Sequence, residues 1–158
     1  MTSLPKGFRG SGIAAGIKSS GNRDLALIVN DGPHKFGTAV FTSNRVHAAP
    51  VAWSKQVIAD KEVSAVILNS GGANACTGPE GFADTHKTAE VVAERLSISA
   101  GDVVVCSTGL IGVRLPMEKL LMGIDLAVVE LSQVNAENIA EAIMTTDSKP
   151  KYVSCLLY

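Results

Sequence analysis

The feature that most constrains the fold is a pattern that occurs twice along the chain. In each copy an apolar, β-branched segment is followed by small residues and then by a helical segment. The first copy is VSAVILN (63–69) followed by SGGANACTG (70–78), and the second is DVVVCS (102–107) followed by TGLIG (108–112). Apolar runs of this length, bounded by glycine, predict buried strands. Strands that alternate with helices in this way indicate an α/β or α+β layered fold.

The remaining elements are weaker in pattern. Residues 24–31 (DLALIVND) predict a third buried strand, and residues 37–43 (GTAVFTS) a strand that pairs with it as a hairpin across Gly32-Pro33. Residues 1–23 are rich in Gly, Ser and Lys and predict an irregular start, whereas residues 51–60 predict a short helix.

Three longer helical segments follow from periodicity and from helix-end signals. Phe82, Ala89, Val92 and Leu96 fall on one face of a helix that follows residue 78. A second helix opens at Leu115-Pro116 and runs to about residue 131. Either Asn135 or Asn138 is expected to cap a last helix that ends near Met144.

Composition limits what the chain can bind and where it can act. Hydrophobic residues make up 46%, charged residues 18% and aromatic residues 4%, so the core must consist of Val, Ile, Leu and Ala. The low charge suggests that one face packs against a missing partner or a missing half. The net charge of -1, with both signs interspersed, argues against a nucleic-acid footprint or a polybasic membrane anchor.

The chain has no apolar run near the ~18 residues of a membrane helix and no secretory signal, which predicts a cytoplasmic protein. Cys76, Cys106 and Cys155 have no metal-like spacing and are expected to be buried free thiols in a reducing compartment.

The two small-residue stretches are the places where chemistry is expected. Glycine lets the backbone approach a ligand closely, and free N–H groups there can hold an anion or a developing oxyanion. Tight turns are the competing interpretation, and spacing alone favours them slightly. Nucleotide-binding fingerprints are absent, His34, His47 and His86 lack a second metal ligand nearby, and Ser107 does not lie in a G-x-S-x-G motif. His86 is expected to be a packed or surface residue.

Several segments, in one order and with fixed separations, resemble a known family. They are AVILNSGGANACTGPEGFADT (65–85), CSTGLIGVRLPMEKL (106–120) and AIMTTD (142–147), together with residues 12–29 and 39–51. The resemblance is to the ornithine acetyltransferase family, also called bifunctional glutamate N-acetyltransferases, and it covers residues 7–151. It implies a layered α+β sandwich like that of the self-processing DmpA-type aminopeptidases.

The resemblance also implies a reaction. Family members move an acetyl group from N-acetylornithine to glutamate in arginine biosynthesis, need no cofactor, and in some cases use acetyl-CoA as donor. Their precursor cuts itself into α and β chains, commonly assembled as two of each, and the new N-terminal threonine of the β chain is the nucleophile. By position, Thr108 and Gly109 would form the oxyanion hole. Thr145 or Thr146 would bind substrate, and Asn69, Gly72 and Asn74 would shape the site or simply form a structural loop.

The nucleophile has no counterpart in this sequence, because no threonine lies in Ala-Thr-Met-Leu surroundings. Residues 152–158 (YVSCLLY) do not resemble the family at that place, which divides the chain into an α-chain region (1–151) and a non-matching tail, and predicts an incomplete fold. Two interpretations stay open: part of an acetyltransferase that is inactive as an isolated chain, or a non-catalytic domain that only binds a ligand or partner.

Overall fold

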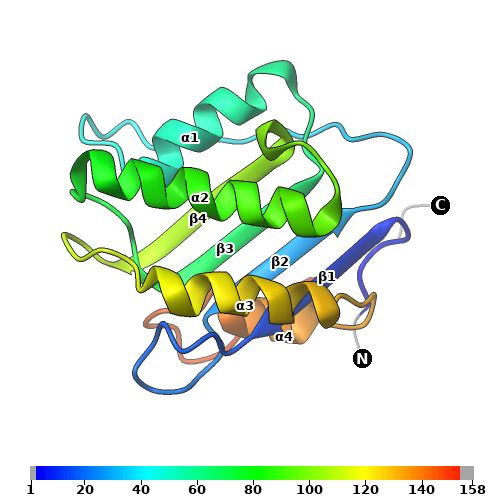
Figure 1. Cartoon of the computed structure of the whole chain (residues 1–158). Coiled ribbons are helices and arrows are strands. Elements are labelled where there is room, and N and C mark those ends of the chain that lie inside the picture. Colours follow the sequence, from blue (N-terminus) through cyan, green and yellow to red (C-terminus); the bar gives the residue numbers. More distant parts are fainter. Residues whose placement is uncertain (1–2, 154–158) are drawn as a thin grey trace.

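The computed structural model describes residues 3–153 and places helices on both faces of one four-stranded sheet (Figure 1). The strands are β1 (Phe8–Ile13), β2 (Leu25–Asn30), β3 (Ala65–Gly72) and β4 (Val103–Leu110), in that spatial order. The pairs β1–β2 and β2–β3 are antiparallel, whereas β3–β4 is parallel. Parallel neighbours need a crossover connection, and helix α2 (Gly78–Leu96) is that crossover.

The other helices cover the sheet unequally. Helix α3 (Met117–Val129) lies beside α2 on one face, and α4 (Ala136–Ala142) packs on the opposite face against β1 and β2 (Figure 1). Helix α1 (Ala49–Val57) continues into a 3-10 turn (Ile58–Asp60), and a second 3-10 turn (Ala100–Asp102) precedes β4. The predicted layered α/β architecture is therefore confirmed.

Strand β2 shows how the sheet divides its side chains between two faces. Leu25, Leu27 and Val29 enter the main core under α2 and α3, while Ala26 and Ile28 face α4. This alternation is the two-residue period of a strand. Apart from Pro50, every buried apolar side chain in the described part of the chain is Val, Ile, Leu or Ala, as the low aromatic content predicts.

Helix α1 protects the exposed edge of the sheet at β4. The Ser54 hydroxyl donates to the Val105 carbonyl (2.8 Å) and accepts from the Val105 N–H (3.1 Å). The Trp53 indole N–H donates to the Val103 carbonyl (2.9 Å). These side chains take the place of a fifth strand, so the edge presents fewer unpaired backbone groups to other chains.

Two sequence predictions are wrong at the start of the chain. Residues 8–13, expected to be irregular, form the edge strand β1, and residues 37–43, expected to pair with 24–31, form no strand. Both neighbours of β2 are already supplied by β1 and β3, so no position remains for a further strand. The segment instead runs across the surface with Val40 99% exposed.

The expected cysteine burial is also wrong, because Cys76 and Cys106 are both exposed free thiols and Cys155 lies outside the described residues. Cys106 lies on the same side of β4 as Val104, opposite the side on which Val103 and Val105 enter the main core.

The helix predictions are confirmed. Residues 51–60 fall in α1 and its 3-10 extension, and α2 buries Ala89 and Val92 completely while Phe82 and Leu96 are partly buried. Helix α3 begins directly after Pro116. Asn135, not Asn138, holds the N-cap position of α4, although its side chain donates to the Gly10 and Glu130 carbonyls and does not cap the helix.

Candidate active site

The two small-residue stretches, expected to be loops after the strands, each begin inside a strand: residues 70–72 are the last of β3 and residues 108–110 the last of β4. Parallel pairing continues to Gly72 and Leu110, with a bulge at Gly71 and Gly72. Gly71 (φ 111°) and Gly109 (φ 130°) face each other in conformations that favour glycine. A Cβ at Gly109 would lie 2.6 Å from the carbonyl carbon of Gly71, so close backbone packing alone requires glycine there.

A cavity of about 700 Å³ opens beside this bulge, and it gathers the predicted site residues. Thr108 and Gly109 come from β4, and Thr145 and Thr146 from the segment after α4. The full lining is residues 17–20, Gly71, residues 108–110, Thr145 and Thr146. Segments far apart in the sequence therefore meet at one place, which is the arrangement a substrate site needs.

The segment that carries Thr145 and Thr146 is fastened to the sheet on two sides. The Ser70 hydroxyl, which is fully buried, donates to the Ala142 carbonyl at the end of α4 (2.5 Å). The Lys18 ammonium donates to the Met144 carbonyl (2.6 Å). These two bonds fix the backbone immediately before Thr145.

No sequence pattern assigns a role to Lys18 or Asp24, but the structure places Lys18 in the cavity lining and Asp24 buried beneath the loop that carries it. The Asp24 carboxylate is fully buried and accepts from the N–H groups of Ala15 (2.7 Å) and Lys18 (2.8 Å), which folds residues 14–24 into a tight loop. Burial lowers the pKa of Lys18, and the negative charge of Asp24 opposes that effect. The sequence signal was a lone acidic residue directly before an apolar strand, which is too common to single out.

A second cavity of about 840 Å³ adjoins the first and shares Lys18, Ser20 and Thr145 with it. Its lining is more strongly charged. Arg23 donates to the Glu141 carboxylate (3.1 Å) and to the Gly12 carbonyl (2.5 Å), and Asp147, which also lines this cavity, pairs with Lys151. The hydrogen bond from Lys151 keeps the pKa of Asp147 below its usual value.

Asn69, Gly72 and Asn74 have structural contacts. Asn69 accepts from Ser107 (2.5 Å) and donates to the Gly72 carbonyl (3.0 Å), which joins the ends of β3 and β4. A Cβ on Gly72 would lie 2.7 Å from the Leu115 side chain. The described contacts thus favour the structural interpretation for these positions.

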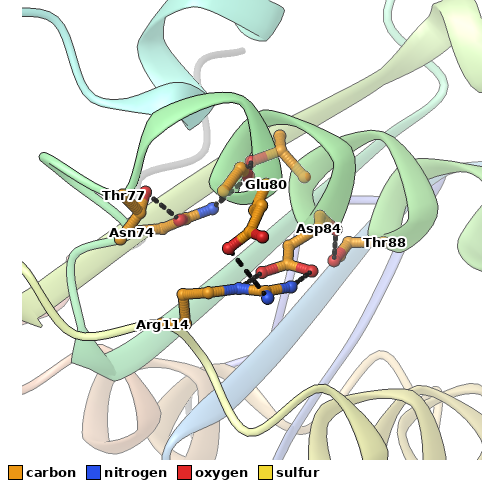
Figure 2. Close-up of polar contacts among 8 residues, drawn as sticks. Asn74, Thr77, Glu80, Asp84, Thr88 and Arg114 are labelled. Carbon is orange, nitrogen blue, oxygen red and sulfur yellow. Dashed lines mark hydrogen bonds and ion pairs between the residues drawn. The ribbon is translucent and has the colours of Figure 1, made fainter.

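Asn74 joins the end of β3 to helix α2 (Figure 2). Its side chain is fully buried, donates to the Gly81 carbonyl (2.8 Å) and the Thr85 hydroxyl (2.9 Å), and accepts from the Thr77 hydroxyl (2.7 Å). The left-handed backbone at Asn74 (φ 46°) is one that asparagine tolerates better than most residues.

The segment after β4 is held to the same helix by an ion pair. Arg114 makes a two-pronged contact with the buried Asp84 carboxylate (2.9 and 2.7 Å) and a third contact with Glu80 (3.2 Å), as Figure 2 shows. The bond to Asp84 raises the pKa of Arg114 above its ordinary value. This contact ties the segment that follows Leu110, the last cavity-lining residue of β4, to α2.

The chemical groups at the first cavity are hydroxyls, backbone amides and one ammonium. In the part of the chain that the structure describes, no group of three His, Cys, Asp or Glu residues is placed to hold a metal ion. No helix among these residues is long and apolar enough to cross a membrane. His86 is half-exposed on α2 and packs on the Trp53 ring (5.0 Å between centroids), as expected for a packed or surface residue.

Solved structures share this fold. The ornithine acetyltransferase of Mycobacterium tuberculosis, solved as a complex with ornithine, is 58% identical with a TM-score of 0.89 over 91% of this chain and 78% of that one. The arginine biosynthesis bifunctional protein ArgJ of Bacillus halodurans is 38% identical with a TM-score of 0.83, over 93% and 78%. The fold is that of the ornithine acetyltransferases.

The sequence is similar to one family along nearly its whole length. The ArgJ family model matches residues 9–157, and the chain belongs to the ArgJ family. The arginine biosynthesis bifunctional proteins ArgJ of Streptomyces avermitilis and Thermobifida fusca are 64% and 60% identical, over 92% and 93% of this chain. The family resemblance inferred from the motifs is therefore confirmed, whereas the division at residue 151 stays a prediction.

The chain spans only about 38% of the length of these curated relatives. It covers 39% of the curated M. tuberculosis relative but 78% of the M. tuberculosis chain in the solved structure. That solved chain is consequently about half as long as the curated sequence.

Proposed function

We propose that this chain forms one half of the active site of an acetyltransferase that moves an acetyl group from N-acetylornithine to glutamate. The observation that carries the proposal is the single cavity lined by Thr108, Gly109, Thr145 and Thr146. Membership of the ArgJ family supports the reaction class, and the solved relative with bound ornithine supports the substrate class.

The nucleophile comes from the second half of the enzyme in this proposal. A threonine hydroxyl attacks the acetyl carbonyl of N-acetylornithine, the C–N bond breaks, and ornithine leaves after its amine takes the proton. The amine of glutamate then attacks the acetyl ester, and the threonine hydroxyl is restored. A free α-amino group on that threonine, with a pKa of ~7.7–8.0, accepts and returns the proton.

Thr108 and Gly109 stabilise the oxyanion in both steps. In this role the Thr108 hydroxyl or N–H and the Gly109 N–H donate hydrogen bonds to the carbonyl oxygen as it becomes negative. One such donor contributes about 2.7–4 kcal/mol to transition-state stabilisation. The bulge between β3 and β4 supports this role, because bulges change the direction of backbone groups beside active sites. Thr145 and Thr146 bind the ground-state substrate in the same cavity.

The partner half packs beside the cavity. Leu110, Ile111 and Val113 are 67%, 68% and 58% exposed, and Leu110 itself lines the cavity. Several exposed apolar side chains next to a site are typical of a surface that another chain covers. The curated relatives' greater length supplies sequence for such a half, and we propose that the two chains assemble in the α2β2 manner.

Complementation tests the function. The chain is assayed for acetyl transfer from N-acetylornithine to glutamate alone and together with a β half from a relative. Activity is expected only for the complemented pair, since the sequence has no threonine in the expected Ala-Thr-Met-Leu surroundings. Transfer by the isolated chain above a buffer blank contradicts the proposed division of labour, and an inactive pair that forms a stable complex favours a non-catalytic binding domain. Acetyl-CoA in place of N-acetylornithine tests the second donor.

Within the complemented enzyme, Thr108→Ala tests the oxyanion role better than any change at Gly109, where packing already excludes a side chain. A fall in kcat of about 100-fold or more, with little change in KM, is expected if the hydroxyl donates. Thr145→Ala should raise KM instead. Full kcat in both variants would return Thr108 to a purely structural role.

A further inference from the structure

Lys18 is placed to give the cavity its charge. In the part of the chain that the structure describes, it is the one charged residue lining the first cavity, and no carboxylate lines it. The other polar groups there are hydroxyls and backbone amides, which donate hydrogen bonds to an anion as readily as they accept. A cavity of this make-up favours an anionic ligand.

The Lys18 ammonium is held in position by the protein. It donates to the carbonyls of Arg23 (3.0 Å) and Met144 (2.6 Å), and its own backbone N–H is bound to Asp24. An ammonium has three N–H groups. Two are used in these bonds, which leaves the third N–H for a ligand.

Lys18 also lies close to the proposed reaction centre. A Cβ built on Gly71 would lie 3.3 Å from Cγ of Lys18, and Gly71 is the residue against which Gly109 packs. Lys18 and Gly109 both line the first cavity, and each lies against Gly71. A ligand bound in this cavity can therefore contact Gly109 with one group and Lys18 with another.

We infer that Lys18 binds the α-carboxylate of the amino-acid substrate and makes the cavity selective for acetylated amino acids over acetylated amines. The inference rests on the proposed function and extends it to substrate selection. N-acetylornithine and glutamate differ in side-chain charge, but both carry an α-carboxylate beside the nitrogen that gives or takes the acetyl group. One fixed cation can thus hold the acetyl donor and the acetyl acceptor with their α-nitrogens in the same position.

Substrate analogues provide the test in the complemented enzyme. N-acetylornithine is compared with N-acetyl-1,4-diaminobutane, which has the same chain without the carboxylate, with glutamate as the acceptor in both cases. The wild-type protein should prefer N-acetylornithine in kcat/KM, and Lys18→Gln should reduce that preference by about 10- to 100-fold, the range for one charge-assisted hydrogen bond. Glutamine keeps donors for the two carbonyls but has no charge, and Lys18→Arg, which keeps the charge, should retain most of the preference.

Lys119 offers a matched control. Its ammonium also donates to a carbonyl of the same loop, Gly16 (3.1 Å), but Lys119 does not line the cavity. Lys119→Gln should leave the preference between the two donors unchanged. A ratio that is the same in Lys18→Gln and wild type would overturn the inference and leave Lys18 as a structural residue that holds Met144.

Binding separates this inference from the proposed function. If the complemented pair transfers no acetyl group, the reaction is contradicted, but calorimetric titration of the same pair with the two donors still reports on Lys18. Tighter binding of N-acetylornithine in wild type that is lost in Lys18→Gln supports the inference. Equal affinity for the two compounds in wild type refutes it.

Discussion

Gly12 offers the sharpest test of how the sheet receives helix α4. A Cβ built on Gly12 would lie 2.1 Å from the carbonyl oxygen of Asn138, 2.3 Å from its carbonyl carbon and 2.7 Å from the N of Ile139. All three are backbone atoms of α4, so no side-chain rotation can relieve the contact. Because Cβ contacts essentially never fall below 3.0 Å, Gly12→Ala must displace α4 by about 1 Å.

The cost follows from what α4 buries. Overpacking of this kind costs about 1–3 kcal/mol. Ile139, Ala140 and Ala142 are 8%, 5% and 0% exposed, and if α4 separates from the sheet the lost burial of Ile139 alone costs about 1.5–3 kcal/mol. We therefore expect Gly12→Ala to lower the free energy of unfolding by about 2–3 kcal/mol. The segment with Thr145 follows α4, so ligand binding in the cavity should weaken as well.

Urea unfolding measures the loss, and Gly101→Ala is the control. Gly101 has an ordinary backbone conformation, and its Cβ would meet only the Ser99 hydroxyl at 3.3 Å, so the change should stay within about 0.5 kcal/mol. Faster amide hydrogen exchange in residues 136–144 of Gly12→Ala would locate the loss in α4. Equal unfolding midpoints for Gly12→Ala and wild type would refute the packing argument.

Two further predictions concern the β4 edge of the sheet and the loss of stability at low pH. Ser54→Ala should destabilise the chain by about 2–4 kcal/mol, measured by thermal unfolding, because it leaves the buried N–H and carbonyl of Val105 without their partner; a change below 0.5 kcal/mol would mean that water replaces the hydroxyl. The hydrogen bond from Arg9 lowers the pKa of Asp31 below 3.8. The ion pair therefore adds stability that is present above pH 3.8 and is lost as the pH falls through the lowered pKa. Arg9→Gln should cost at most about 1 kcal/mol at pH 7, since both side chains are over 40% exposed, and the cost should shrink as the pH falls through the lowered pKa; a cost that does not change with pH would contradict the electrostatic origin.

Most of the core could be predicted from the sequence. Strands β3 and β4 are long apolar runs, and α2 has a clear 3.6-residue period, so local pattern and burial agree. Strand β1 could not be predicted, because FRGSGI contains two glycines and no apolar alternation. Glycine is required in β1 because α4 packs closely on it. The backbone of Asn138 in α4 lies against Gly12, although the two residues are far apart in the sequence.

The candidate site divides in the same way. The sequence motifs around Thr108 and Thr145 predict that these residues belong to a site. Both residues line the first cavity, but their roles stay predictions. Lys18 was missed because its importance depends on a bond to Met144, 126 residues away. No local pattern contains that information.

We could infer from the sequence alone the family, the apolar strands and helices, and the small-residue segments where chemistry is expected, because each of these is a property of consecutive residues. Tertiary contacts, by contrast, determine that β1 closes one edge of the sheet, that α1 protects the other, and that Asp24 shapes the loop beside the cavity. Such contacts also place Lys18 against Gly71, in the same cavity as Gly109. These facts depend on contacts between segments far apart in the chain, and such contacts form only when the burial of apolar faces brings those segments together.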